Sequence, residues 1–168
     1  RPEDYGNTES FIHSDTLHAA IIACWAKLGE PIPDNGDPGY FISSLFPFTR
    51  AGEETLYFFP KLMKPWNIAE ERITYAKKLK HLRWLDQHYF ECQLNDNSVN
   101  GFGGNEEPHL RGIFASVREV GEFITKQVSQ RVVIPRQRDE ENDPRPFYME
   151  RLFFKENSGL YFLFEGSE

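Results

Sequence analysis

Residues 13–30, with the sequence HSDTLHAAIIACWAKLGE, constrain the fold most because they predict one helix with two clear ends. Ser14 is a favourable N-cap, and Asp15 lies in the first turn, where the helix dipole favours a negative charge. Gly29 suits the left-handed end of a helix, and the prolines that follow prevent its continuation. The apolar residues recur at the spacing of one helical face, formed by Leu17, Ala20, Ile21, Cys24, Trp25 and Leu28. We therefore expect a helix over residues 14–28 that buries one face against a sheet.

The composition indicates one packed domain with an acidic surface. The chain has 168 residues, which is enough to bury a core, and its 15 Phe, 7 Tyr and 3 Trp argue against disorder. The net charge of -7 argues against nucleic-acid binding that depends on overall charge. Any RNA site on this protein must therefore be a local basic patch.

The compartment is expected to be the cytoplasm. Cys24 and Cys92 both fall at apolar helical positions and suggest no disulfide framework, which fits a reducing environment. No apolar run approaches the ~20 residues that a membrane-spanning helix needs. No signal peptide is visible, although the sequence begins with Arg1 rather than Met.

The middle of the chain predicts a strand and three helices. Residues 55–59 are typical of a strand, and residues 69–82 of a helix. Asp86 is expected to cap a second helix, with a hydrophobic staple between Leu85 and Phe90. Ser116 and Glu119 fit the capping box of a third helix that continues to Val128. The inner face of the second helix is expected to hold Leu85, His88, Tyr89 and Cys92.

The C-terminal part predicts a hairpin with strands at residues 147–155 and 160–165. The connecting residues 156–159, ENSG, supply the Asn and Gly that a tight turn favours. Both faces of these strands are largely apolar, so the hairpin needs cover on both sides. Core packing is the preferred interpretation of its aromatic residues, and base stacking is the alternative.

Basic residues gather in three places on this acidic chain. A β-branched strand at residues 132–134 leads into Arg136 and Arg138, whose guanidinium groups suit phosphates or stacked bases. The acidic residues 139–143 follow at once and are alternative ion-pair partners. A loop with Lys61, Lys64 and Trp66 suits a phosphate backbone or a solvated surface. The helix at 69–82 carries a basic run that suits RNA, a partner protein or solvent, formed by Arg72, Lys77, Lys78, Lys80 and Arg83.

A catalytic alternative starts from His13, Asp15 and His18. Asp15 and His18 are three residues apart and are neighbours on one helix, where they suit a metal ion or acid–base work in phosphodiester hydrolysis. A metal site needs three or four converging ligands, and local spacing places only these together. The favoured interpretation is therefore that His13 and Asp15 satisfy the helix start. A second alternative is a protein-interaction module that does not contact RNA.

Five stretches of the sequence resemble one family, in the family's order. They are FIHSDTL (11–17), FISSLFPFTR (41–50), LYFFPK (56–61), RVVIPR (131–136) and FYMERLFFKENSGLYFLFE (147–165). The chain resembles the RAMP superfamily, and within it the Csm-type subunit of type III-A CRISPR effector complexes that holds the 5′ handle of guide RNA. The family's first strand and its glycine-rich second half are absent, so we expect a single RAMP-like domain, 1–168, from a longer protein.

The resemblance implies an α+β, ferredoxin-like (RRM-like) fold with an antiparallel sheet and helices on one face. It implies a non-catalytic, cofactor-free role in antiviral defence. The implied partners are the crRNA 5′ handle, the large polymerase-like signature subunit and the backbone RAMP subunit. The expected RNA-binding residues are Arg136 and Arg138, supported by Arg131, Lys61, Lys64, His13 and Ser14.

Overall fold

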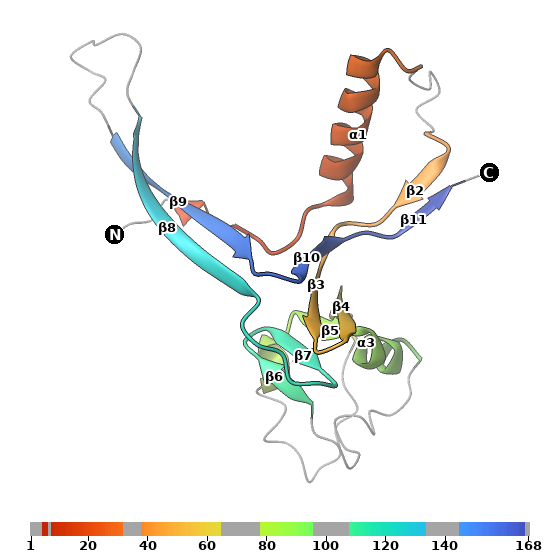
Figure 1. The fold of residues 1–168 in the computed structure, drawn as a ribbon, viewed down its shortest axis with the longest axis vertical. Coiled ribbons are helices and arrows are strands. Elements are labelled where there is room, and N and C mark those ends of the chain that lie inside the picture. Colours follow the sequence, from red (N-terminus) through yellow and green to blue (C-terminus); the bar gives the residue numbers. More distant parts are fainter. Residues whose placement is uncertain are drawn as a thin grey trace.

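The structure is a computed structural model, and it describes residues 5–6, 8–31, 38–64, 78–95, 108–133 and 145–166. Within these ranges the chain forms a body with two arms that point away from it in different directions (Figure 1). One arm is a long ribbon of two strands with the two-residue strand β1 (Tyr5–Gly6) along one edge, and the other holds the first helix beside a short strand pair. The mixture of strands with separate helices confirms the predicted α+β class.

The body is a six-stranded sheet in the order β10-β3-β4-β5-β7-β6. β5 and β7 are parallel, and the other neighbours in this sheet are antiparallel. The short helix α3 (Gln87–Leu94) packs against β4, β5 and β7. The strands are β3 (Phe46–Ala51), β4 (Glu54–Pro60), β5 (Trp84–Asp86), β6 (His109–Arg111), β7 (Phe114–Ser116) and β10 (Ser158–Tyr161). The predicted strand at 55–59 is therefore confirmed as β4.

Aromatic rings form the core of the body. Phe58 on β4 is fully buried, and its ring lies 4.9 Å from that of Phe114 and 5.6 Å from that of Phe123. Trp84 stacks on Phe114 at 6.4 Å and joins the same cluster. The alternating burial along β4 explains why this strand carries the centre of the core, since only every second side chain points inward.

Asp86 joins the sheet to α3 and confirms the predicted cap. One carboxylate oxygen accepts a hydrogen bond from the Tyr89 N–H at 3.0 Å, and the other accepts one from the Val117 N–H at 2.6 Å. Leu85 and Phe90 pack in one cluster, as a hydrophobic staple requires. The predicted inner face of α3 is wrong in part, because Gln93 is buried with Tyr89, whereas His88 is exposed.

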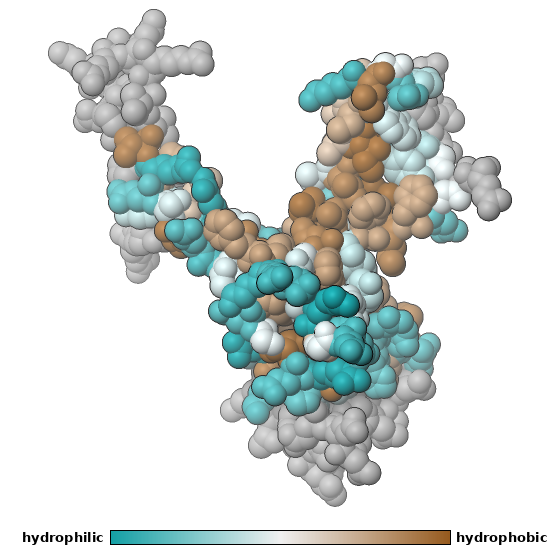
Figure 2. All heavy atoms as spheres, in the orientation of Figure 1, coloured by the Kyte–Doolittle hydropathy of each residue, from teal (hydrophilic) through white to brown (hydrophobic). Residues whose placement is uncertain are grey.

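α1 (Ser14–Leu28) has the predicted bounds and ends at Gly29 as expected, but its N-cap and its burial differ from the prediction. The N-cap is His13, and the N–H of Ser14 instead donates to the hydroxyl of Ser44 at 3.1 Å. No residue of α1 is buried, and hydrophobic residues remain visible along it (Figure 2). The expected packing on the main sheet is wrong because α1 lies beside β2 (Tyr40–Ile42), where the rings of Trp25 and Tyr40 meet edge to face at 5.9 Å. Neither α1 nor any other described helix has the length and hydropathy to cross a bilayer.

The predicted helix from Ser116 to Val128 is wrong, because these residues form the end of one strand, a turn and the first strand of the ribbon. Ser116 ends β7, and its hydroxyl donates to the Arg118 carbonyl at 2.7 Å in a turn. The chain then forms β8 (Ile124–Val133), which pairs along its whole length with β9 (Arg145–Phe154). The cross-strand pairing outweighs the local capping signal, since ten residues of β8 gain a partner strand.

The predicted hairpin of residues 147–165 is also wrong. β9 pairs with β8 and with β1 (Tyr5–Gly6), whereas β10 pairs with β3, and β11 (Phe164–Gly166) pairs with β2. The turn residues do redirect the chain, and Asn157 has the positive φ of 58° expected there. Gly159 lies so close to Phe48 that a Cβ would be 3.1 Å from its ring, which favours docking of β10 on β3.

Candidate nucleic-acid interface

Pairing between β8 and β9 sorts their side chains onto two faces. Residues directly opposite each other in an antiparallel pair point to the same side. One face therefore combines Arg131 with Phe147 and Gln127 with Arg151, and it continues through the pairs Ser129 with Met149 and Thr125 with Phe153. We call these eight residues the arginine face.

The arginine face holds exposed cations and exposed rings. Arg131 and Arg151 are both exposed, and Phe147 and Phe153 keep 38% and 46% of their surface in solvent. None of the eight residues is acidic, and neither arginine has an ion-pair partner among the described residues. About 14 Å of strand separates the two arginine positions, because Arg131 lies four residues along β8 from the partner of Arg151. Such a surface suits several consecutive nucleotides.

The opposite face of the ribbon has a different electrostatic character. Glu150 lies there, and it accepts a hydrogen bond from the Lys126 ammonium at 2.9 Å. This bond, with one from the Thr8 N–H, holds the pKa of Glu150 below its usual value. Glu150, the carboxylate in the described part of the ribbon, therefore forms an ion pair with Lys126 and points away from the arginine face.

The sequence predicted only one residue of this face. Arg131 was expected as a supporting contact, and it lies exposed near the outer end of β8. Arg136 and Arg138 fall between β8 and β9 and lie outside the described residues. The sequence assigns Phe147 and Phe153 to the apolar hairpin and does not single out Arg151. The signal that was missed is the register, since only pairing with β8 shows that one face of β9 has basic, aromatic and polar neighbours without a carboxylate.

Lys61 and Lys64 follow the end of β4 and are not part of the ribbon. The Lys61 ammonium donates to the Leu79 carbonyl at 3.0 Å, and partial burial lowers its pKa. The backbone carbonyl of Lys64 accepts a hydrogen bond from the Gln93 amide at 3.2 Å. In this structure Lys61 therefore links the end of β4 to the helical residues 78–81 that precede β5, and its expected RNA contact stays a prediction.

The start of α1 does not form the metal cluster of the catalytic alternative. His18 Nδ1 lies 2.9 Å from the Tyr40 hydroxyl, and the ring of His13 meets that of Phe11 at 4.8 Å. The hydroxyl of Ser14 donates to Asp15 at 3.4 Å. Within the described ranges no three His, Cys, Asp or Glu side chains converge as a metal site would require.

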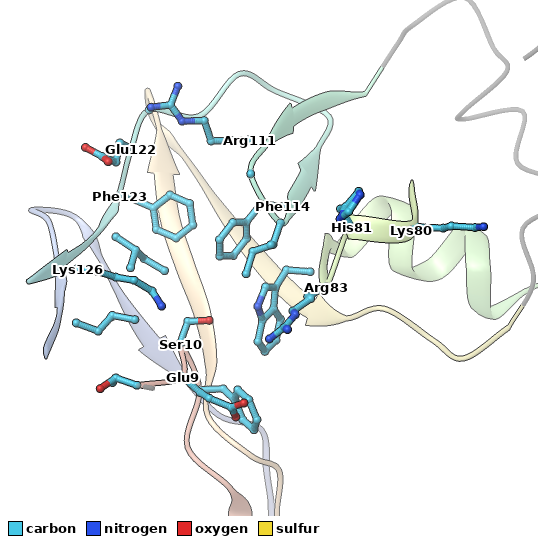
Figure 3. Close-up of a pocket in the computed structure, with 18 residues that line it drawn as sticks. Glu9, Ser10, Lys80, His81, Arg83, Arg111, Phe114, Glu122, Phe123 and Lys126 are labelled. Carbon is cyan, nitrogen blue, oxygen red and sulfur yellow. The ribbon is translucent and has the colours of Figure 1, made fainter. Parts of the chain in front are cut away.

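A groove of about 850 Å³ lies at the base of the ribbon, between β8 and the end of the main sheet. Its lining includes the buried side chains of Trp84, Phe114 and Phe123, and Figure 3 labels the two phenylalanines. Its lining also contains four cationic side chains and two carboxylates, namely Lys80, Arg83, Arg111, Lys126, Glu9 and Glu122. The sequence singled out Lys80 and Arg83 as part of a basic run, and it missed Arg111 and Lys126. We call this cavity the basal groove.

The fold of the chain is similar to chains in three crystal structures. One is the Csm3–Csm4 subcomplex of the type III-A CRISPR-Cas interference complex, with a TM-score of 0.57, 16% sequence identity and coverage of 92% of this chain and 52% of that chain. The Csm1–Csm4 cassette in complex with cA4 matches with a TM-score of 0.54 and 24% identity, covering 95% of this chain and 57% of that one. The same cassette in complex with AMPPNP matches with a TM-score of 0.52 and 23% identity, covering 94% of this chain and 58% of that one.

The chain has the fold of a Csm subunit. The resemblance found in the sequence is therefore confirmed at the level of the fold. No protein-family model matches the sequence, and no curated protein is similar to it. The chain spans between 52% and 58% of the length of the three matching chains.

Proposed function

We propose that this protein is a non-catalytic subunit of a type III-A CRISPR ribonucleoprotein complex and binds the 5′ handle of crRNA through the arginine face. The observation that carries the proposal is a ribbon face with two exposed arginines, two exposed rings and no described carboxylate, on a chain of net charge -7. This is the local basic patch that an acidic RNA-binding protein needs.

The chemistry of the face fits single-stranded RNA. Arginine offers a planar fork to phosphates, and exposed phenylalanines stack on unpaired bases. Phe147 lies directly across from Arg131, so one ring and one guanidinium group are available to the same nucleotide or to neighbouring ones. Arg136 and Arg138 belong to the connection beyond this end of the ribbon, and we propose that they extend the same contact.

The proposed partners also include other subunits of the complex, namely the large signature subunit and the backbone RAMP subunit. The matching chains come from complexes of Csm subunits, which supports partners of this kind. A second support is the exposed apolar surface on the other arm. Leu28, Phe41 and Phe164 keep 76%, 77% and 64% of their surface in solvent. Apolar exposure of this extent is typical of protein-binding surfaces.

The RNA proposal is tested by fluorescence anisotropy with labelled crRNA, with and without its handle, over a range of salt concentrations. Arg131→Ala with Arg151→Ala is expected to weaken handle binding about tenfold, or ~1.4 kcal/mol. The slope of log affinity against log salt should fall by about 1.4, since each phosphate contact on a single strand contributes ~0.7. Arg136→Ala with Arg138→Ala is expected to cause a loss of at least about tenfold.

The matched control is Lys27→Ala with Arg50→Ala, which removes two exposed charges outside the ribbon. This variant is expected to bind the handle within about twofold of the parent protein. Equal affinity of the folded Arg131→Ala, Arg151→Ala variant and the parent would refute the site. Metal-dependent cleavage of the RNA that His13→Ala abolishes would replace the proposal with the nuclease alternative.

A further inference from the structure

The outer edge of β8 is the longest free strand edge among the described residues. β8 pairs with β9 on one side, and no described strand pairs with its other side. β6 and β10, which end the main sheet, have only three and four residues, whereas β8 has ten. Its sequence, ITKQVSQRVV, contains no proline or glycine, and its pairing with β9 is continuous, without a bulge. An edge of this kind is a template for pairing with another chain.

Two hydrogen bonds show which backbone groups of β8 face this edge. The Glu150 carbonyl of β9 accepts a hydrogen bond from the Thr8 hydroxyl at 2.5 Å on the side of β1, so this carbonyl points away from β8. Residues opposite each other in an antiparallel pair exchange both backbone hydrogen bonds or neither. Because Val128 lies opposite Glu150, its N–H and C=O point away from β9. The Ser129 hydroxyl reaches the next carbonyl, that of Met149, from the β8 side, as this alternation requires.

The alternation gives β8 a row of outward-facing backbone groups. They belong to Lys126, Val128, Gln130 and Val132, which are all exposed. Within the described ranges none of these N–H and C=O groups has a hydrogen-bond partner in the protein. Donors and acceptors recur along the row about every 7 Å. A peptide strand offers acceptors and donors in the matching order, whereas the phosphates of RNA offer acceptors only.

The side chains beside this edge define the strand that fits it. On one face of the ribbon, Val128 and Val132 keep 50% and 52% of their surface in solvent. On the other face, Arg131 has no ion-pair partner among the described residues, and β8 contains no carboxylate. Lys126 is already paired with Glu150. An added strand therefore gains most from apolar side chains on the first face and a carboxylate beside Arg131 on the second.

A second copy of β8 fits this edge less well. Its strand supplies no carboxylate for Arg131. A symmetric pair of β8 edges also places the two arginine faces side by side, so that Arg131 and Arg151 of both copies gather on one surface. Each copy carries a net charge of -7 as well. These like charges oppose self-association and favour a different protein as the partner.

We propose that the outer edge of β8 binds an extended segment of a partner protein, which adds a strand beside residues 126–132 and alternates apolar with polar or acidic side chains. This inference rests on the proposed role in a complex of protein subunits, and it locates a docking site for one of them. The added strand extends the ribbon sideways and leaves both of its faces uncovered. Backbone hydrogen bonds supply the affinity in such a complex, and alternate side chains supply the specificity.

The probe is a labelled peptide in which valines alternate with threonines and one central glutamate. Fluorescence anisotropy with the full chain, without RNA, is expected to show saturable binding. NMR is expected to show slower amide exchange at residues 126, 128, 130 and 132 in the complex, because these N–H groups face the peptide. The same peptide with N-methylated backbone amides is expected to bind at least about tenfold more weakly, since it donates no backbone hydrogen bond.

A proline on the outer edge separates strand addition from folding. Val128→Pro removes an outward N–H and keeps every bond to β9, and an edge strand tolerates such a proline. It is expected to weaken peptide binding at least about tenfold, whereas the matched control Val128→Thr, which keeps the N–H, stays within about threefold. Gln130→Pro tests the next outward position and replaces Val128→Pro if that variant does not fold. The folded variants are expected to bind handle RNA within about twofold of the parent, since the arginine face is unchanged.

Three results would overturn the strand-addition proposal. They are the absence of peptide binding, equal binding of the N-methylated peptide, and equal affinity in the folded proline variants. Self-association without peptide that Val128→Pro abolishes would also overturn it, because the occupant would then be a second copy. Failure of peptide binding with normal handle binding leaves the handle site standing. Peptide binding with normal handle affinity in Arg131→Ala, Arg151→Ala removes the handle site and supports the strand site.

Discussion

Asp86 allows the most direct test of how the body is held together. Its two oxygens accept backbone hydrogen bonds from Tyr89 and Val117, so one buried carboxylate caps α3 and fixes the start of the segment that leads into β8. In Asp86→Ala the lost cap costs about 1 kcal/mol. The half-buried Val117 N–H is left without its acceptor, at a cost of about 1–3 kcal/mol. A total of about 3 kcal/mol corresponds to roughly 10 °C in Tm for a chain of this size.

The same carboxylate predicts a pH dependence of defined sign. Burial raises the pKa of Asp86, and the backbone bonds from Tyr89 and Val117 lower it by less. The folded state therefore holds the proton more tightly than the unfolded state does. Stability from this group is present below the unfolded pKa and is lost as pH rises through the higher folded pKa. Asp86→Asn removes this dependence, although its amide keeps an acceptor for only one of the two N–H groups.

The assay is chemical denaturation of the parent, Asp86→Asn, Asp86→Ala and Asp15→Ala at several pH values between 4 and 7. Asp15 is an exposed carboxylate in the first turn of α1, and its removal is expected to cost only about 0.5 kcal/mol. The difference between the parent and Asp86→Asn isolates the titration of Asp86 from that of the other carboxylates. A loss below about 1 kcal/mol in Asp86→Ala would refute the role of this side chain in joining the body.

Two further predictions concern the core and the expected RNA contacts. Phe58→Ala is expected to cost about 3–5 kcal/mol, because it removes a fully buried ring that packs on Phe114 and Phe123, and a denaturant melt of the folded variant measures it. A cost below about 1.5 kcal/mol would contradict the core described here. Lys61→Met is expected to lower stability by about 1 kcal/mol through the lost bond to the Leu79 carbonyl, and the crRNA affinity of the same folded variant tests the phosphate contact expected of Lys61. A tenfold loss of affinity in this variant would support Lys61 as a phosphate contact, and an affinity within twofold of the parent would remove that assignment.

The sequence alone determined the features that depend on neighbouring residues. The bounds of α1, the strand at β4, the Asp86 cap and the positive φ near Asn157 all follow from local spacing, capping and turn chemistry. The need for a local basic patch also followed from the net charge, and the α+β class from the family resemblance. The helix bounds, the cap and the turn are set within a few residues of chain, so no distant partner is needed to decide them.

The tertiary structure decided which segments meet. Residues 124–133 form β8 because β9 offers a partner over ten residues, and this pairing overrides a helical capping signal at Ser116. The same register, which no local pattern contains, turns Arg131 and Arg151 to one side and Glu150 to the other. The basal groove likewise joins Arg83, which directly precedes β5, and Arg111, which ends β6, to residues at the base of the ribbon. The arginine face and the basal groove exist because strand pairing brings together side chains from distant parts of the sequence. The free energy of that pairing depends on the whole fold.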